Sequence, residues 1–386
     1  MKAGLIAWIV VIIILGVLSV LLVVNIDFNP TGAAVGIGND EIILGSVLPL
    51  TGDISSLGQG AKSAMEIAVR EINNKGGING KKLKIIYEDG NCNAKEAANA
   101  ANKLINIIKV PVIVGGVCSS ETLAMAPLAE ASKTVLFSPC SSAPSITNAG
   151  DYIFRSYPSD DFEGNFGAEF VYNELGIRKV ATMTCLSDWC VGINRVFEKS
   201  FKELGGDIVE KEEFEQGSKD LRTQLTKIKK SNPELIYFIS YTESAIAGLE
   251  QIRELNIDAK VLGANTFDDP NILKRSKESG EGTMFSILDS DVSDEFKAKI
   301  KKQTGSEDIP VCTTQGYDNI YILVDIIERV GLDSEKIKNE IYKVKNYQGV
   351  SGVLTFDENG DVLATNYVIK IYHNNKAIKL EDYEAQ

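Results

Sequence analysis

Residues 111–128 of the 386-residue chain, PVIVGGVCSSETLAMAPL, form one complete strand-to-helix unit. Apolar residues at 111–114 are followed by two glycines, and a helical pattern begins at Ser119. A short apolar run that ends in glycine is typical of a buried strand, and serine often starts a helix because its hydroxyl can cap a free backbone N–H. The unit therefore predicts a buried strand whose carboxyl end leads directly into a helix.

The same alternation of strand and helix extends in both directions from this unit. Strands are expected at 42–48, 83–87, 111–114, 135–137, 179–184, 206–211, 235–240 and 260–263, and helices at 59–74, 94–108, 119–131, 164–175, 191–204, 221–229, 244–255 and 315–330. A hairpin of 353–356 and 367–372 is expected around the turn at 357–361. Because strands joined by helices pair in parallel, the pattern predicts an α/β fold of two doubly wound lobes, with the rhythm restarting after Pro158.

An uncharged apolar segment, Leu5–Val24, precedes the alternating region. As a helix its about 20 residues would span roughly 30 Å, the thickness of a membrane's hydrocarbon core. We interpret residues 1–26 as an uncleaved single-pass membrane anchor and 27–40 as a flexible tether; a long signal peptide and a buried core helix are the alternatives. Since Lys2 is expected to stay inside, residues 25–386 are expected outside the cell.

The composition restricts the partners and the redox state of the chain. Its net charge is −13, and no run of Lys or Arg marks a nucleic-acid surface, so nucleic acid is not an expected partner. Six cysteines in an exported domain are expected to be paired rather than free. Cys185 and Cys190 lie near enough in sequence to close one small loop, but spacing alone does not choose the remaining pairs.

Hydroxyl side chains follow two neighbouring strands of the first half. Ser119 stands where strand 111–114 gives way to a helix, and Ser141 and Ser142 follow strand 135–137. In open parallel sheets, ligands bind beyond the carboxyl ends of the strands, where helix N-termini offer free N–H groups and a partial positive charge. The pair of strand ends predicts a cradle for a carboxylate. The alternative is that Ser119 and Ser142 only cap their helices.

The second half places aromatic and polar residues at equivalent strand ends. Trp189 follows strand 179–184 and Tyr241 follows strand 235–240, where both rings can close over a small ligand or simply pack at the surface. Asn265, Asp268 and Asp269 follow strand 260–263. A carboxylate at this point is a candidate partner for a ligand ammonium, although loop carboxylates are usually solvated.

An enzyme and a metal or cofactor site are both poorly supported. A serine or cysteine nucleophile needs a base, and the single histidine, His373, lies in the late hairpin. No G-x-S-x-G motif occurs. Residues 89–93 match only the start of a calcium loop, and 58–60 lack the third glycine of a dinucleotide fingerprint. We therefore expect no catalysis, no metal and no cofactor.

Several stretches together resemble the leucine/isoleucine/valine-binding family of type I substrate-binding proteins, which serve ABC importers. The stretches are PLTG (49–52), AVREINNKGGINGKKLKIIYEDGNC (68–92), VCSS (117–120), SPCSSAP (138–144), FRSYPSDDFEG (154–164) and GVLTFDENGD (352–361). The resemblance covers about residues 42–380. It implies two Rossmann-like lobes joined by three crossovers near Pro158, Phe285 and Gly352. Lobe 1 would comprise 41–158 and 286–351, and lobe 2 would comprise 159–285 and 352–380.

The resemblance also implies roles for individual residues. Ser119 matches the residue that holds the ligand carboxylate, Cys140 a position whose backbone carbonyl accepts from the ammonium, and Ser142 a hydroxyl that contacts both ends of an amino acid. Leu57 and Trp189 replace aromatic pocket residues, and Tyr241 matches a tyrosine. The expected ligand-binding set is Leu57, Cys118, Ser119, Cys140, Ser141, Ser142, Trp189, Tyr241, Asn265 and Asp268.

Asn265 is the main departure from the family pattern. Branched-chain binders have a glutamate at this position, which pairs with the ligand ammonium. We expect Asn265 to hydrogen-bond and Asp268 or Asp269 to supply the charge. Because of this change the ligand class stays open between an amino acid, an amide and a urea-like solute.

One disulfide is also an implication of the resemblance. Cys92 and Cys118 match a disulfide of amino-acid-binding members. With Cys185–Cys190 closing the loop that carries Trp189, Cys140 and Cys312 remain as the third pair.

These observations together predict a membrane-tethered extracytoplasmic receptor. It would capture a small carboxylate-bearing solute in a cleft between its lobes and deliver it to an ABC permease without changing it chemically. A sensory receptor ectodomain of the same fold is the alternative, and an enzyme is the third possibility.

Overall fold

The computed structural model describes residues 40–363 and 366–385. The expected anchor, 1–26, and nearly all of the expected tether, 27–40, lie outside the described residues. Within the part that is described, no helix combines the length and the apolar character needed to cross a membrane.

Lobe 1 is built on a five-stranded sheet in the order β2-β1-β3-β4-β5. Its strands are β1 (Glu41–Leu48), β2 (Lys82–Asp89), β3 (Val112–Gly115), β4 (Val135–Ser138) and β5 (Ile153–Arg155). The pairs β1–β3, β3–β4 and β4–β5 are parallel, as expected. The chain reverses its winding direction between β1 and β3, and this is the switch point at which ligands bind in open sheets.

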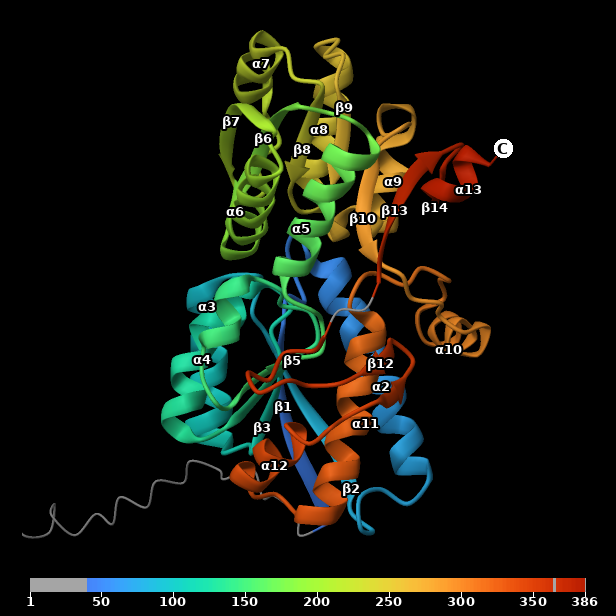
Figure 1. Cartoon of the computed structure of the whole chain (residues 1–386). Helices are drawn as coiled ribbons and strands as arrows, with labels where there is room; N and C mark the ends of the chain where they lie inside the picture. Colours follow the sequence, from blue (N-terminus) through green and yellow to red (C-terminus); the bar gives the residue numbers. More distant parts are fainter. Residues whose placement is uncertain (1–39, 364–365, 386) are drawn as a thin grey trace, which may run out of the picture. The chain divides into compact units, whose positions relative to one another are not determined.

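Helices cover both faces of the lobe 1 sheet (Figure 1). One face carries α2 (Ser55–Asn74) and α11 (Thr313–Val330), which pack on each other. The other face carries α3 (Ala94–Asn102), its π-helical continuation Lys103–Ile108, and α4 (Ser119–Ser132). β3 and β4 are buried along their whole lengths because they are covered on both sides, which explains their uninterrupted apolar sequences.

Lobe 2 is built on a seven-stranded sheet in the order β14-β13-β10-β9-β8-β6-β7. Its strands are β6 (Lys179–Leu186), β7 (Asp207–Glu215), β8 (Leu235–Ile239), β9 (Lys260–Gly263), β10 (Met284–Leu288), β13 (Tyr367–His373) and β14 (Lys376–Lys379). The first five are parallel, and β13 and β14 add an antiparallel edge. Its longer helices are α5 (Asp160–Glu169), α6 (Asp188–Glu203), α7 (Arg222–Ser231) and α8 (Thr242–Glu254), with the shorter α9 (Pro270–Ser276).

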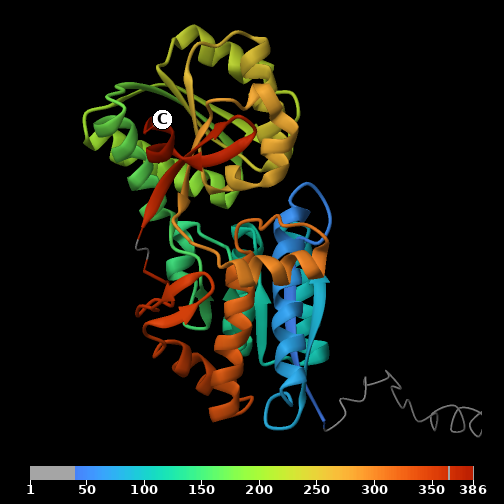
Figure 2. The ribbon, with the colours of Figure 1, turned by 90° about the vertical axis from the view of Figure 1, so that its right-hand side faces the viewer.

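Three chain segments connect the lobes (Figure 2). The first lies between Arg155 and Asp160, at the expected position near Pro158. The second follows Leu288, a few residues later than the expected crossing at Phe285. β10 reaches Leu288 because its whole length pairs antiparallel with β13, a partner more than 70 positions away that local patterns do not reveal.

The expected hairpin of 353–356 and 367–372 is wrong, and the third crossing follows Val362 rather than Gly352. β12 (Gly352–Leu354) pairs with β11 (Tyr347–Gly349), whereas β13 joins lobe 2. Residues 352–362 stay with lobe 1 because Phe356 packs edge-to-face on Phe137, at 5.6 Å between ring centroids, and the Asp361 carboxylate pairs with Arg155.

All six cysteines are paired in the structure. The disulfides are Cys92–Cys118, Cys140–Cys312 and Cys185–Cys190, the same three pairs that were expected. Cys140–Cys312 joins the end of β4 to the start of α11, and Cys92–Cys118 joins the end of β2 to the start of α4.

We expect loss of the Asp361 carboxylate to destabilise the protein strongly. Arg155 is fully buried, and its guanidinium donates two hydrogen bonds of 2.6 Å to Asp361. Asp361→Ala would leave this cation buried and unpaired, at a cost of about 3–5 kcal/mol in the free energy of unfolding. Urea denaturation measures this change.

The matched control is Asp220→Ala, which removes the acid of an exposed Asp–Arg pair with Arg222. Asp220→Ala should lower the free energy of unfolding by only a small fraction of the loss in Asp361→Ala, because exposed ion pairs contribute little to stability. Equal losses in the two variants would contradict a structural role for the buried pair.

Candidate functional site

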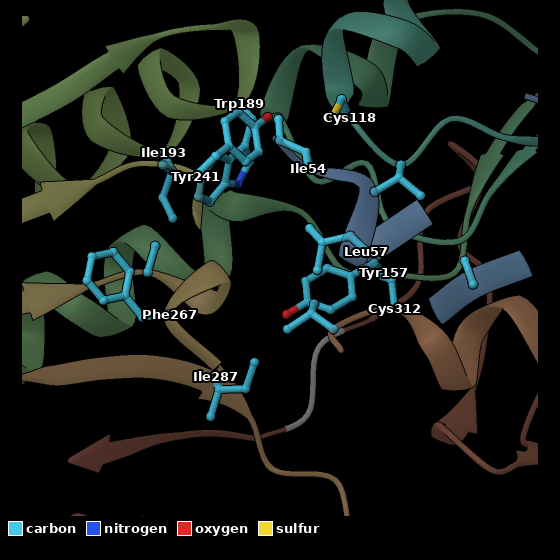
Figure 3. Packing of buried hydrophobic residues seen from close by; sticks show 14 of the residues in the cluster. Ile54, Leu57, Cys118, Tyr157, Trp189, Ile193, Tyr241, Phe267, Ile287 and Cys312 are labelled. Carbon is cyan, nitrogen blue, oxygen red and sulfur yellow. The ribbon is translucent and has the colours of Figure 1, made fainter. Parts of the chain in front are cut away.

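One small cavity lies where strand ends of the two lobes face each other. Eight of the ten residues expected at the site line it: Leu57, Cys118, Ser119, Cys140, Ser142, Trp189, Tyr241 and Asn265. Val117, Thr266 and Val311 complete the lining. Its volume is about 20 Å³, room for roughly one water molecule. Figure 3 shows part of this lining, with Leu57 and Cys118 on one side and Trp189 and Tyr241 on the other.

The loop before α4 takes its shape from a buried carboxylate, Glu121. Its oxygens accept hydrogen bonds from the backbone N–H groups of Val117 (3.0 Å), Cys118 (3.1 Å) and Cys92 (3.0 Å). A Cβ atom at Gly116 would collide with the Glu121 side chain, which is why a glycine stands there. Burial raises the pKa of Glu121 to about 7, and the three N–H donors act in the opposite direction.

The Ser119 side chain is placed by the neighbouring loop. Its hydroxyl oxygen accepts a 3.1 Å hydrogen bond from the N–H of Ala143, so its proton is left to donate elsewhere. Ser119 is also the first residue of α4, whose first N–H groups have no acceptor inside the helix. This corner of the cavity therefore offers donors and the positive end of a helix dipole, which suits an anion.

Ser141 does not line the cavity, contrary to expectation. Its hydroxyl lies 2.7 Å from that of Thr122 and donates to the carbonyl of Gly116 at 3.1 Å. Ser141 therefore joins the two loops that carry Ser119 and Ser142, and contributes to the site by fixing their spacing.

Trp189 and Tyr241 form the lobe 2 wall of the cavity (Figure 3). Their ring centroids are 5.0 Å apart and both side chains are buried. Trp189 lies in the first turn of α6, held by the Ser187 cap and by the Cys185–Cys190 disulfide. The wall is thus a pair of mutually supporting aromatic rings on a short, cross-linked loop.

Asn265 lines the cavity but is bound to an acid that sequence analysis did not select. Its side-chain Nδ2 and its backbone N donate to Glu163 at 2.5 and 2.7 Å, and the Ser286 hydroxyl donates to the same carboxyl group at 2.7 Å. Glu163 is fully buried, and burial raises its pKa to about 7.

Asp268 and Asp269 do not supply charge to this cavity. The Asp268 carboxylate pairs with Lys370 at 3.0 Å. The Asp269 carboxylate accepts from Ser56 at 2.9 Å and from Thr242 at 2.6 Å. Asp268, which was expected at the site, does not line this cavity, because a lysine on a distant strand binds its carboxylate.

Asp160 is the second residue that sequence analysis missed. It is the first residue of α5, which begins before the expected start at 164 because Ser159 caps it. Its backbone N donates to the carbonyl of Ser142 at 2.8 Å, so it lies directly behind the cavity. Its carboxyl oxygens are buried and make no well-aligned hydrogen bond among the described residues, although the Ser142 hydroxyl and the Trp189 indole approach the group as donors.

The environment of Asp160 disfavours its ionised form. Burial and the neighbouring Glu163 raise the pKa of Asp160 well above its usual value, whereas the Ser142 hydroxyl, Arg155 and the Trp189 indole act in the opposite direction. Buried polar groups are nearly always partnered in folded proteins, so a buried carboxyl group without a well-aligned hydrogen bond next to the cavity lining is a notable feature of this site. The signal in the sequence was the pair of acids after Pro158-Ser159.

Comparison with known proteins shows which protein family this chain matches. The family model described as "Periplasmic binding protein" matches residues 41–373. The leucine-, isoleucine-, valine-, threonine- and alanine-binding protein of Pseudomonas aeruginosa is 26% identical over 354 residues, which are 89% of this chain and 93% of that protein.

Solved structures show the same similarity. The leucine-binding protein LivK of Thermotoga maritima aligns with a TM-score of 0.80 and 31% identity over 88% of this chain and 97% of that chain. The branched-chain amino acid transporter substrate-binding protein LivJ of Streptococcus pneumoniae, in complex with isoleucine, aligns with a TM-score of 0.80 and 26% identity over 88% of this chain and 99% of that chain.

We expect Glu121→Ala to loosen the loop that carries Ser119. The variant leaves three buried N–H groups without an acceptor, each costing about 1–3 kcal/mol, so the free energy of unfolding should fall by several kcal/mol. Thermal and urea unfolding measure the loss. Ser120→Ala, in the same turn of α4, is the control and should change stability little; a comparable loss there would argue against a specific role of the carboxylate.

Proposed function

Because this chain belongs to the periplasmic binding protein family, we propose that it captures an aliphatic α-amino acid between its lobes and delivers it to an ABC importer. Its two lobes of largely parallel strands have the type I fold of that family. The relatives named above bind amino acids, which favours this role over that of a sensory ectodomain. We propose that the solute leaves unchanged.

The observation that carries the proposal is that a helix start and a buried acid both adjoin the lining of one cavity. The start of α4 and the Ser119 hydroxyl suit a carboxylate, and the buried carboxyl group of Asp160, next to Ser142, suits an ammonium. An α-amino acid carries both groups on one carbon atom. A neutral amide or urea would satisfy the donors but would leave the buried acid without a cation.

The remaining lining suggests the side chain of the solute. Leu57, Val117 and Val311 are buried apolar residues, and the Trp189–Tyr241 pair completes an apolar wall. Burial of an aliphatic side chain against such a wall contributes roughly 1.5–3 kcal/mol. We therefore propose a solute of the leucine, isoleucine or valine type.

Capture requires the lobes to part, because the cavity of about 20 Å³ does not accommodate an amino acid. We propose that they hinge at the three connecting segments, with lobe 1 as 41–156 plus 294–362 and lobe 2 as 160–288 plus 367–385. Lobe 1 would bind the carboxylate first, and closure would then bring in Trp189, Tyr241 and Asn265.

We further propose that Leu5–Val24 anchors this domain to the membrane, with residues 25–386 outside the cell. The length of this apolar segment supports the anchor, and the three disulfides support an oxidising location. Membrane fractionation of the full chain tests it: recovery of the intact protein in the soluble fraction would contradict the anchor.

The decisive experiment compares solutes that differ by one charged group. L-leucine should raise the melting temperature of residues 41–386, whereas 4-methylpentanoate, which lacks the ammonium, and L-leucinamide, which lacks the carboxylate, should bind at least 100-fold more weakly by calorimetry. Isoleucine, valine, alanine and threonine are measured in parallel. Asp160→Asn should lose leucine binding, and tighter binding of leucinamide or urea than of every amino acid would refute the proposed solute class.

We also expect amino acid binding to release protons below about pH 7. The carboxyl groups of Glu163, with a pKa raised to about 7, and of Asp160 keep protons in the free protein, and an ammonium favours their ionised forms. Affinity for leucine should therefore rise from pH 6 to pH 7.5 and then level off. Calorimetry in two buffers of different ionisation enthalpy measures the proton release; an affinity independent of pH over this range would contradict the linkage.

A further inference from the structure

Glu163 lies one helical turn after Asp160 on α5 and is fully buried. The three hydrogen bonds that its carboxyl group accepts all come from lobe 2, two from Asn265 and one from Ser286. Glu163 does not itself line the cavity, whereas Asn265 does. The acid and the amide are thus one hydrogen-bonded unit of which only Asn265 lines the cavity.

The acid determines which end of the amide faces the cavity. Once a bound ammonium favours the ionised form of Glu163, its carboxylate can only accept hydrogen bonds, so the Asn265 amide must turn its Nδ2 toward it. Its Oδ1 is on the opposite edge of the amide plane and is left as an acceptor. Asn265 therefore presents an oxygen, not an N–H group, to the site.

We infer that Glu163 and Asn265 together replace the single carboxylate that branched-chain binders have at position 265. Asn265 Oδ1 contacts the ammonium of the solute. Glu163 lies behind Asn265, where it orients and polarises the amide. Its carboxylate supplies the negative charge without touching the solute. The inference rests on the proposed function and deepens it, because it explains how the site selects an ammonium without an acid at 265. Glu163 is therefore a positioning residue: it acts through Asn265 on the preference of the site for a solute with an ammonium group.

Electrostatics supports such an arrangement. In a buried site the attraction between opposite charges falls off only as the inverse of distance and is weakly screened, so a carboxylate one hydrogen bond behind the contact atom still favours a cation. The positive charge of Arg155 is offset by its own ion pair with the Asp361 carboxylate. Tyr157, Tyr237 and Tyr367 surround the acids with neutral hydroxyls.

The alternative is that Glu163 only holds Asn265 and Ser286 in place as part of the lobe 2 core. The two roles differ in what they predict for a solute without an amino group. A purely structural acid would affect L-leucine and 4-methylpentanoate alike, whereas an acid that acts on the ammonium would affect leucine alone.

The test is an exchange of acid and amide between the two positions. Calorimetry measures the affinity of the wild type, E163Q, N265E and the double variant E163Q/N265E for the best-bound aliphatic amino acid and for its counterpart without the amino group, which is 4-methylpentanoate for leucine. We expect E163Q to weaken amino acid binding at least 10-fold and the counterpart less than 3-fold. The double variant, with its acid at 265, should recover to within about 3-fold of the wild type.

Two controls separate the possible failures. S286A removes a hydrogen bond to Glu163 but no charge, and should keep the preference for the amino acid over its counterpart. If the wild type binds no aliphatic amino acid, the proposed function fails. If the wild type binds one but E163Q weakens both solutes equally, or binds as the wild type does, the inference about Glu163 is wrong. Failure of the double variant to recover, with E163Q and N265E both folded by circular dichroism, would also overturn it.

Discussion

The buried carboxylate of Glu121 is the contact on which the lobe 1 half of the site depends. By accepting from the backbone N–H groups of Val117, Cys118 and Cys92, it fixes the loop after β3 and ties that loop to the end of β2. The Cys92–Cys118 disulfide crosses the same junction. Because the direction in which α4 begins follows from this loop, the helix N-terminus and Ser119 face the cavity only as long as the loop keeps its shape.

Lobe 2 uses buried acids in a different way. Asp160 and Glu163 lie on one face of α5, an i,i+3 pair, and the charge of Glu163 disfavours ionisation of Asp160. Such a pair is costly in an isolated domain, and a cation relieves the cost. Lobe 1 thus brings free N–H donors to the cavity and lobe 2 brings buried carboxyl groups next to it, which is the basis for the zwitterionic solute that we propose.

Much of the site was predictable from strand ends. Ser119, Ser142, Trp189, Tyr241 and Asn265 all follow predicted strands, and the carboxyl ends of parallel strands converge at one edge of each sheet. Asp268 also follows a predicted strand, but its carboxylate pairs with Lys370. Lys370 lies on β13, which pairs antiparallel with β10 near the edge of the lobe 2 sheet. The expected hairpin failed for a related reason, since Phe356 and Asp361 have partners in lobe 1 that a local turn signal does not reveal.

The sequence by itself determined the alternation of strands and helices, the two lobes and most of the residues that line the cavity, because these follow from apolar periodicity and from chain direction within a parallel sheet. Only the tertiary structure decided which acid binds Asn265. Glu163 is 102 residues away from Asn265, and nothing in the local sequence of either residue indicates that they meet. Long-range hydrogen bonds among buried polar groups depend on how the elements pack, and packing is a property of the whole chain rather than of any segment.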